Sequence, residues 1–266
     1  MKSKASTQTQ TQTNNVPAVI PAIEKTGEVA KRVALLMPLV RTLQAYHRHQ
    51  VVGLRNLPKS GPFLIVTNHS LATYDIMLLF AAIYQNSRRL ARPLVDRAFW
   101  KVPYLGDLMN FFGSVQGSND GGKELLADGN IVAVAPGGMQ EALRPSEERY
   151  QVRWSKRRGF ARMAMEAQVP IILAACPRAD DMFEVYPNFL TKMIYDRLRL
   201  PLPLMRGIGP TIIPRPVKLV HYLSEAMRPP KIDADPEVNQ KRLEVWHQKL
   251  TKRMQQLIGE AIAHEN

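Results

Sequence analysis

Short apolar runs that alternate with amphipathic stretches constrain the fold of this chain more than any other feature of its sequence. The runs are bounded by turn residues, and most of the stretches between them have apolar residues at helical spacing. Strands that alternate with helices favour an α/β fold, so we expect a mixed, mostly parallel sheet flanked by helices. The expected strands are 62–67, 92–96, 111–116, 131–135, 170–176 and 217–222. The expected helices are 74–86, about 104–110, 120–128 and 155–168.

An amphipathic segment lies at each end of this alternating region. Residues 28–48 are apolar and basic, and we expect Pro38 to kink the segment or divide it into two short helices. Such a segment can cap the core or lie in a membrane interface, and the two roles can coexist. Its apolar residues at helical spacing are Val29, Val33, Leu36, Val40 and Leu43. Near the other end, apolar residues at steps of three and four between 243 and 261 predict a helix packed on the core.

Two other segments differ from the alternating pattern in composition. Residues 1–16 are polar and low in complexity, which is typical of a disordered tail. Residues 186–216 combine Pro, Gly and Arg with large apolar residues. A well-packed loop would explain this composition, but we favour a partly exposed element that touches a membrane or lines an acyl chain. We therefore divide the chain into a mostly disordered tail at 1–27, a helical membrane-associating segment at 28–50 and one main domain at 51–266.

A net charge of +13 calls for an anionic partner, which would be anionic lipid, a nucleotide-bearing substrate or nucleic acid. Nucleic acid is disfavoured, because aromatic residues make up only 7% of the chain and the basic residues are scattered. No run of about 18 apolar residues is present, so a conventional membrane-spanning helix is not expected. The single cysteine, Cys176, excludes an intramolecular disulfide and suggests a reducing compartment. We therefore expect peripheral or monotopic membrane association on the cytoplasmic face.

The stretch "IVTNHSLATYD" ends an apolar strand in Asn68 and His69 and places Asp75 six positions after the histidine. In a single helix these two side chains would lie about 120° apart, so a loop must reverse between them. Thr73 can cap a helix that begins after it, and Asp75 then lies in the first turn, where free N–H groups stabilise its charge. The pattern predicts a general base, His69, held by Asp75. A purely structural histidine is the alternative for such a pair alone.

Four blocks in a fixed order resemble the glycerolipid acyltransferase superfamily, which joins fatty acyl groups to lipid hydroxyls. "NHSLATYD" resembles its first motif and "PLVDRAFWKVPYLGDLMNFFGSVQGS" its second, while "VAVAPGGMQEAL" and "QVPIILAA" stand at the third and fourth. The resemblance carries Asn68 and Arg97 over as substrate-binding residues. It covers about residues 50–230, implies a glycerol-3-phosphate acyltransferase-like fold, and makes 51–266 an acyltransferase domain.

Two departures from the superfamily pattern favour one of its branches. Five residues rather than the usual four separate His69 from Asp75, and the third motif lacks Glu-Gly-Thr-Arg. Both features resemble the branch of type 2 diacylglycerol acyltransferases, the transmembrane protein 68 group and plant phytyl ester synthases. In that branch Pro-Gly-Gly-x-x-Glu, here residues 136–141, is followed by a basic Arg-Lys/Arg-Gly-Phe segment, here residues 157–160.

The resemblance implies acyl transfer from an acyl thioester, acyl-CoA, to a lipid hydroxyl, with acyl-CoA as a co-substrate and no separate cofactor. His69, oriented by Asp75, would take the proton of the acceptor hydroxyl and later protonate the thiolate. The backbone N–H groups of Gly137 and Gly138 are candidates for an oxyanion site, or for a plain tight turn. Glu141 is expected to position the acceptor hydroxyl or to cap that turn. The six histidines are dispersed, so no metal site is expected.

The third motif also bears on the acceptor. Superfamily members that bind a phosphorylated glycerol hold its phosphate with arginines in motifs two and three, but here these positions read "QGS" (116–118) and "MQ" (139–140). We therefore expect a neutral lipid alcohol, such as mono- or diacylglycerol or a long-chain alcohol. Arg144 can substitute for the missing arginine, which keeps a lysophospholipid acyltransferase acting on 1-acyl-glycerol-3-phosphate as the alternative.

A basic cluster follows the third motif. Lys156, Arg157, Arg158 and Arg162 are expected to meet the phosphates of coenzyme A or anionic lipid headgroups, although a solvated helix face would also explain them. The alternative from another functional class is a non-catalytic basic protein that binds lipid or nucleic acid, and the net charge is the only feature that supports it.

Overall fold

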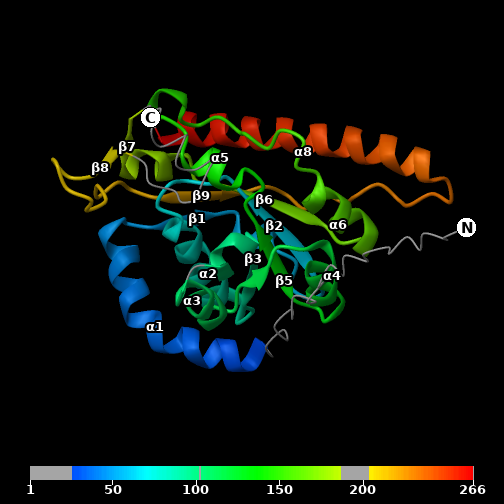
Figure 1. Ribbon diagram of the computed structural model, residues 1–266, viewed down its shortest axis with the longest axis horizontal. Coiled ribbons are helices and arrows are strands. Elements are labelled where there is room, and N and C mark those ends of the chain that lie inside the picture. Colours follow the sequence, from blue (N-terminus) through cyan, green and yellow to red (C-terminus); the bar gives the residue numbers. More distant parts are fainter. Residues whose placement is uncertain (1–25, 102, 187–203, 266) are drawn as a thin grey trace, which may run out of the picture.

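The computed structural model describes residues 26–101, 103–186 and 204–265. Within these ranges, the centre is a seven-stranded sheet with strand order β1-β9-β6-β2-β5-β3-β4 (Figure 1). Its strands are β1 (Gln50–Val52), β2 (Phe63–Thr67), β3 (Ala91–Val95), β4 (Val115–Gln116), β5 (Ile131–Val134), β6 (Ile171–Ala175) and β9 (Val220–Leu223). A smaller sheet pairs β7 (Glu184–Val185) with β8 (Met205–Arg206).

The expected mixed, mostly parallel sheet is confirmed. Each pair of neighbours from β6 to β4 is parallel, whereas β9 is antiparallel to β6 and parallel to β1. Every residue of β2 is buried, as expected for a strand in a parallel sheet covered on both faces. The apolar run that predicted this strand therefore reflects its central place in the sheet.

Helices cover both faces of the sheet (Figure 1). Phe63 and Ile65 of β2 pack on one face with α2 (Tyr74–Ser87), and α1 (Thr26–Tyr46) packs in turn on α2. Leu64 and Val66 face the opposite way and pack with α4 (Asn119–Ala127), α6 (Gly159–Ala167) and α8 (Pro236–Glu265). The period-two alternation of a strand thus divides the apolar core between the two faces. The shorter helices are α3 (Leu105–Phe111) and α5 (Gly138–Ala142), with 3-10 turns η1 (Leu54–Asn56), η2 (Arg97–Lys101), η3 (Ser146–Glu148) and η4 (Pro177–Met182).

Most expected helices and strands are confirmed to within a few residues, and the exceptions are short. Only Val115–Gln116 of the expected strand 111–116 forms β4, because α3 continues to Phe111 and Gly113 turns the chain with a φ of +72°. β1 and α5 were not predicted, since elements of three and five residues show no periodic pattern.

The N-terminal segment is one bent helix. α1 begins at Thr26, slightly before the expected start at 28, and residues 1–25 of the expected tail lie outside the described residues. Pro38 lies inside α1, and Figure 1 shows the helix bent rather than divided. A proline removes one helical hydrogen bond and crowds the preceding turn, which explains the bend. Among the described helices, none has both the length and the hydropathy that a membrane span requires.

Apolar side chains are exposed on α1 and on the segment that contains β8. Leu35 and Leu39 of α1 are 76% and 60% exposed, whereas Val29 and Val40 face the core. Residues 187–203 of the segment 186–216 lie outside the described residues. The rest of that segment is linked to α1 by Tyr46, whose hydroxyl donates to the carbonyl oxygen of Pro214 (2.7 Å). The exposed apolar residues in the described part of segment 186–216 are Leu204, Ile208, Ile212 and Ile213.

Gly113 fixes the contact between α1 and the sheet. A Cβ on Gly113 would lie 2.4 Å from Cγ1 of the fully buried Val29. The carbonyl oxygen of Gly113 also accepts a hydrogen bond from Nε of the buried Arg92 (2.7 Å). A side chain at position 113 therefore has to move α1 or the turn.

We expect Gly113→Ala to lower the free energy of unfolding by about 3 kcal/mol, because a left-handed backbone cost and a steric cost add. Gly61→Ala is the matched control, since Gly61 has a φ of +75° but no atom within 4 Å of the added Cβ. In Gly61→Ala the free energy of unfolding should fall only by the cost of the left-handed backbone, about 1–2 kcal/mol. Urea unfolding of both variants measures the difference, and equal losses would contradict a steric contact with α1.

Candidate active site

The carboxyl ends of the parallel strands meet at one edge of the sheet, where ligands of open α/β sheets bind. Asn68 and His69 follow β2 at this edge, the turn at 136–138 follows β5, and Cys176 follows β6. The sheet therefore brings the first, third and fourth sequence motifs together, although they are distant in the chain.

His69 is an uncharged imidazole with a defined tautomer. Its Nδ1 lies 2.9 Å from the carbonyl oxygen of Ser70. A carbonyl oxygen only accepts, so Nδ1 carries the hydrogen and Nε2 keeps a lone pair. Burial lowers the pKa of His69, and the charges of Arg144 and Arg157 lower it further against the opposing effect of the Ser70 hydrogen bond. Nε2 is therefore a proton acceptor at neutral pH.

Asp75 does not bind His69 directly, so the expected contact between the two side chains is wrong. The hydroxyl of Ser70 donates to Oδ1 of Asp75 (2.7 Å), while the carbonyl oxygen of the same serine binds His69. The cause is the loop before α2, where Thr73 adopts a φ of +59° and the chain reverses between Ser70 and Tyr74. This reversal places the Ser70 hydroxyl, and not the imidazole, against the first turn of α2.

The start of α2 otherwise agrees in part with the prediction from the sequence. Asp75 lies in the first turn, as expected, and is 1% exposed. Burial raises the pKa of Asp75 to about 6, against the lowering effect of the hydrogen bond from Ser70. Thr73 precedes the helix as expected, but its hydroxyl donates to the carbonyl oxygen of Ser70 (3.3 Å) and does not cap the helix.

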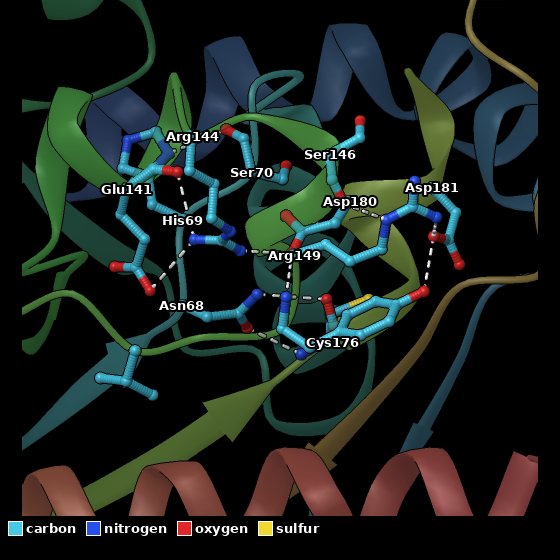
Figure 2. A network of polar contacts seen from close by, with 12 residues as sticks. Asn68, His69, Ser70, Glu141, Arg144, Ser146, Arg149, Cys176, Asp180 and Asp181 are labelled. Carbon is cyan, nitrogen blue, oxygen red and sulfur yellow. Dashed lines mark hydrogen bonds and ion pairs between the residues drawn. The ribbon is translucent and has the colours of Figure 1, made fainter. Parts of the chain in front are cut away.

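Asn68 joins the ends of β2 and β6. Its Oδ1 accepts from the N–H of Cys176 (2.8 Å), and its Nδ2 donates to the Cys176 carbonyl oxygen (3.2 Å). The two bonds extend the pairing of parallel strands by one side chain, and Figure 2 shows them below His69. Asn68, predicted to bind substrate, is thus engaged in the scaffold that positions the histidine.

A buried arginine links two carboxyl groups near His69 (Figure 2). Nη1 of Arg144 lies 3.5 Å from Oε1 of Glu141, and Nη2 donates to Oδ2 of Asp180 in η4. The three side chains are 3%, 0% and 8% exposed, respectively. The carboxylate of Asp180 also accepts from the N–H of Tyr150 (2.9 Å). The charge of Arg144 is therefore compensated inside the protein.

Glu141 is held under the turn at 136–138. A Cβ on Gly137 would lie 1.6 Å from Oε2 of Glu141, so only glycine leaves room for this carboxyl group. Neither carboxyl oxygen of Glu141 has a hydrogen-bond partner in the described part of the chain. Burial raises the pKa of Glu141 to about 7, against the lowering effect of Arg144.

The turn itself leaves one of its two candidate N–H groups available. The N–H of Gly138 donates to the carbonyl oxygen of Ala135 (3.0 Å), which fits the plain tight turn that was the alternative to an oxyanion site. The N–H of Gly137 donates to no group among the described residues. Nη1 of Arg157 donates to the carbonyl oxygens of Pro136 (3.0 Å) and Gly137. Arg157 thus holds the turn, which is a different task from the expected contact with a substrate phosphate.

Two expected residues lie apart from this network. Arg158 donates to Glu244 of α8 (2.6 Å), because the side chain just before α6 points to the helix layer and not to the sheet edge. Arg97 is exposed at the start of η2, after β3.

A small cavity adjoins the buried network of Glu141, Arg144 and Asp180. Arg144, Arg149 and Asp180 are among the residues that line it, whereas His69 is not.

Several functional candidates were not predicted. Ser70 lies inside the first motif, but spacing alone does not show that it would separate His69 from Asp75. Asp180 follows the fourth block at the same sheet edge, and this position was the one signal that could have identified it. The Asp181 carboxylate accepts from Arg149 (3.1 Å) and Tyr150 (2.6 Å), and no sequence pattern indicated this pair.

Comparison with known proteins decides the family. Residues 48–176 match the model of the family described as Acyltransferase. This chain belongs to that acyltransferase family. The matched region contains the base candidate His69, the turn at 136–138 and the end of β6.

Two curated relatives of this chain are described as "DGAT1/2-independent enzyme synthesizing storage lipids". The protein from Bos taurus is 32% identical over 192 residues, which cover 71% of this chain and 55% of the relative. The protein from Homo sapiens is 31% identical over 199 residues, which cover 74% of this chain and 58% of the relative. The chain therefore spans little more than half of the length of these relatives.

A solved structure of the 1-acyl-sn-glycerophosphate (LPA) acyltransferase PlsC from Thermotoga maritima is a more distant match. The TM-score is 0.45 with 16% sequence identity, and the alignment covers 85% of this chain and 88% of that chain. A likeness of this degree supports no argument about substrate.

The raised pKa of Glu141 predicts a pH-dependent gain in stability for Glu141→Gln. Ionising this buried group costs the folded state free energy as the pH rises through about 7. The variant should therefore melt about 2–5 °C above the parent at pH 8, and this gain should shrink toward pH 5, where the folded parent is already protonated. Thermal unfolding at both pH values measures it, with exposed Glu124→Gln as the control. An equal gain at pH 5 and pH 8 would show that ionisation of Glu141 is not the cause.

Proposed function

We propose that this chain transfers a fatty acyl group from acyl-CoA to a lipid hydroxyl, with His69 as the general base. The observation that carries the proposal is the geometry of His69 inside the matched family region. Its Nδ1 is occupied by Ser70, its pKa is lowered by burial, and its Nε2 is left as a proton acceptor at the carboxyl edge of the sheet.

The proposed reaction needs one proton acceptor and no cofactor. Nε2 of His69 takes the proton of the acceptor hydroxyl while the hydroxyl oxygen attacks the thioester carbon. The tetrahedral intermediate breaks its C–S bond, and the imidazolium returns the proton to the leaving thiolate. An ester and a free thiol result, and the imidazole is restored. The N–H of Gly137 is the remaining turn donor for the oxyanion.

Asp75 acts on His69 through Ser70 in this proposal. Its ionised carboxylate accepts the Ser70 hydroxyl and so fixes the residue whose carbonyl oxygen orients the imidazole. Because its pKa is raised to about 6, Asp75 is largely ionised at pH 7 and becomes protonated in mild acid. We therefore assign Asp75 a positioning role and not direct contact with the reacting atoms.

A neutral lipid alcohol fits the site better than a phosphorylated acceptor. The arginine that was expected to replace the missing phosphate ligand, Arg144, is buried between Glu141 and Asp180 and its charge is compensated. A phosphate beside these carboxylates would lack a free cation and would face their charge. The name of the relatives, which refers to storage lipids, supports the same class of acceptor, such as mono- or diacylglycerol or a long-chain alcohol.

The phosphates of acyl-CoA would meet exposed basic residues. Arg97 follows β3 at the same sheet edge and is exposed, as are Lys156 and Arg162 near the start of α6. Arg157 and Arg158 are already engaged, the former with the turn and the latter with Glu244. Arg97, Lys156 and Arg162 are therefore the expected basic residues that stay available for the donor.

Membrane association through one end of the molecule completes the proposal. Leu35 and Leu39 of α1 and the exposed apolar residues of 204–213 lie on segments joined by the bond from Tyr46 to Pro214. Figure 1 places α1 and β8 at the same end. Apolar side chains that cover no core of their own would enter the interface of a membrane, peripherally or monotopically, at its cytoplasmic face.

A panel of acceptors with radiolabelled acyl-CoA tests the reaction. We expect acylation of mono- or diacylglycerol or a long-chain alcohol, and a loss of about 10²–10⁴-fold in kcat/KM for His69→Ala, the range attributed to a general base. Exposed His264→Ala should retain activity, and circular dichroism checks that both variants fold. Rapid acylation of lysophosphatidate with neutral alcohols inert would replace this proposal by the lysophospholipid alternative. Unchanged activity in folded His69→Ala would overturn the assignment of His69 as the base. A folded parent protein that acylates no acceptor of the panel would favour the non-catalytic binding protein.

Flotation with vesicles of neutral and anionic lipid tests the membrane surface. The intact chain should float, and Leu35→Glu/Leu39→Glu should reduce the bound fraction at least about tenfold, because two apolar side chains would lose their burial in lipid. Val245→Glu is the control, since Val245 is 66% exposed on α8, on the opposite face of the sheet. The control should float like the parent, and equal losses in both variants would point to a general effect of added charge.

A further inference from the structure

Asp75 faces a second, unassigned histidine on the side that does not bind Ser70. Its Oδ2 lies 3.8 Å from Nε2 of His221 in β9, and both side chains are 1% exposed. Nε2 of His221 has no hydrogen-bond partner among the described residues. Nδ1 of His221 lies 3.0 Å from Nε2 of His49, a partly exposed residue just before β1. A row of polar groups thus leads from the surface to the buried carboxylate.

The two histidines determine which hydrogen faces Asp75. One of the two nitrogens in the His49–His221 contact must donate, because two lone pairs at 3.0 Å would repel. If Nε2 of His49 donates, then Nδ1 of His221 accepts and its Nε2–H points to Asp75. If Nδ1 of His221 donates instead, the lone pair of its Nε2 faces Asp75. A lone pair repels a carboxylate, so this tautomer favours the protonated form of Asp75. The tautomer of His221 and the charge of Asp75 are therefore linked.

We propose that His221 is a positioning residue of the acyl-transfer site, which presents Nε2–H to the ionised Asp75 while His49 fixes this tautomer. The inference rests on the proposed function, because it assigns a partner to the carboxylate that holds Ser70 and thereby His69. An N–H donor favours the charged form of a carboxyl group, whereas burial opposes it. His221 thus supports the ionised state of Asp75 from β9, on the side opposite Ser70.

Two further titratable groups bear on this contact: the carboxyl group of Asp180, whose charge raises the pKa of Asp75, and a thiol. Sγ of Cys176, at the end of β6, lies within 4.8 Å of the nearest ligand atoms of Asp75 and His221. Burial raises the pKa of Cys176 well above its usual value, so the thiol is neutral and adds no charge to the pair. Burial also lowers the pKa of His221, and His49 lowers it further, so both imidazoles are neutral. Asp75 is then the charged member of its contact with His221 and Cys176.

Two variants of His221 distinguish the effect of its N–H donor from the effect of its packing volume. His221→Gln keeps an N–H donor that can reach Asp75, whereas His221→Leu fills similar space without one. We expect His221→Leu to move the acidic limb of the kcat/KM profile to higher pH by about one unit, because Asp75 loses a donor. This shift corresponds to a loss of about tenfold on that limb. His221→Gln should recover at least half of the shift, and exposed His264→Leu should leave the profile in place. An unmoved limb in folded His221→Leu would overturn the proposal.

A spectroscopic measurement tests the tautomer without depending on activity. Nitrogen–proton correlation spectra of protein with ¹⁵N-labelled histidine should show His221 as the Nε2–H tautomer at pH 7.5, assigned by the signal that His221→Gln removes. The Nδ1–H tautomer would overturn the proposal. An inactive parent protein with the Nε2–H tautomer would contradict the proposed function but would leave the assigned tautomer of His221 in place. Stoichiometric zinc that survives gel filtration and is lost in both His221→Gln and Cys176→Ser would also overturn it, because the three side chains would then be ligands of a metal.

Discussion

The position of every group in the candidate site depends on how strand β2 is held and where it stops. β2 pairs with β5 on one side and with β6 on the other, and its five residues are buried on both faces of the sheet. Polar residues appear only where this apolar run ends. There the side-chain amide of Asn68 accepts a hydrogen bond from the N–H of Cys176 and donates one to its carbonyl oxygen. These two bonds continue the pairing of β2 and β6 beyond the end of β2. His69 is the next residue, so its backbone is anchored by a rigid sheet while the carbonyl oxygen of Ser70 orients its imidazole.

Opposing charges surround this histidine. Burial lowers the pKa of His69 and the guanidinium groups of Arg144 and Arg157 lower it further, so the imidazole is uncharged at neutral pH. The carboxyl groups of Asp75, Glu141 and Asp180 are all buried, and burial raises the pKa of each. An imidazolium that forms for a moment would be stabilised by those carboxyl groups that are ionised. The two sets of charges together fit a base that must both accept and release a proton within one catalytic cycle.

The fold could be predicted from the sequence, and so could the convergence of the motif residues at one sheet edge, because both depend on apolar periodicity. Strands buried on both faces give continuous apolar runs, and the motif residues at their carboxyl ends necessarily meet at one edge of the sheet. The contacts within the site could not be predicted. Ser70 separates His69 from Asp75 because Thr73 adopts a positive φ, which residue spacing does not encode. Adjacent Arg157 and Arg158 look equivalent in the sequence, yet one binds the turn and the other binds α8. That difference depends on the rotation of α6, which only tertiary packing fixes.

The glycine at position 137 has a consequence for how this chain can diverge. Because the Glu141 carboxyl group occupies the space of a Cβ at position 137, the two positions cannot drift independently. A substitution of the glycine would expel the acid from beneath the turn, and the Arg144 beside it would lose one of its two buried counter-charges. A descendant of this chain that acquires a side chain at 137 should therefore also replace the acid at 141. The paired change would identify homologues in which the charge of Arg144 is compensated differently.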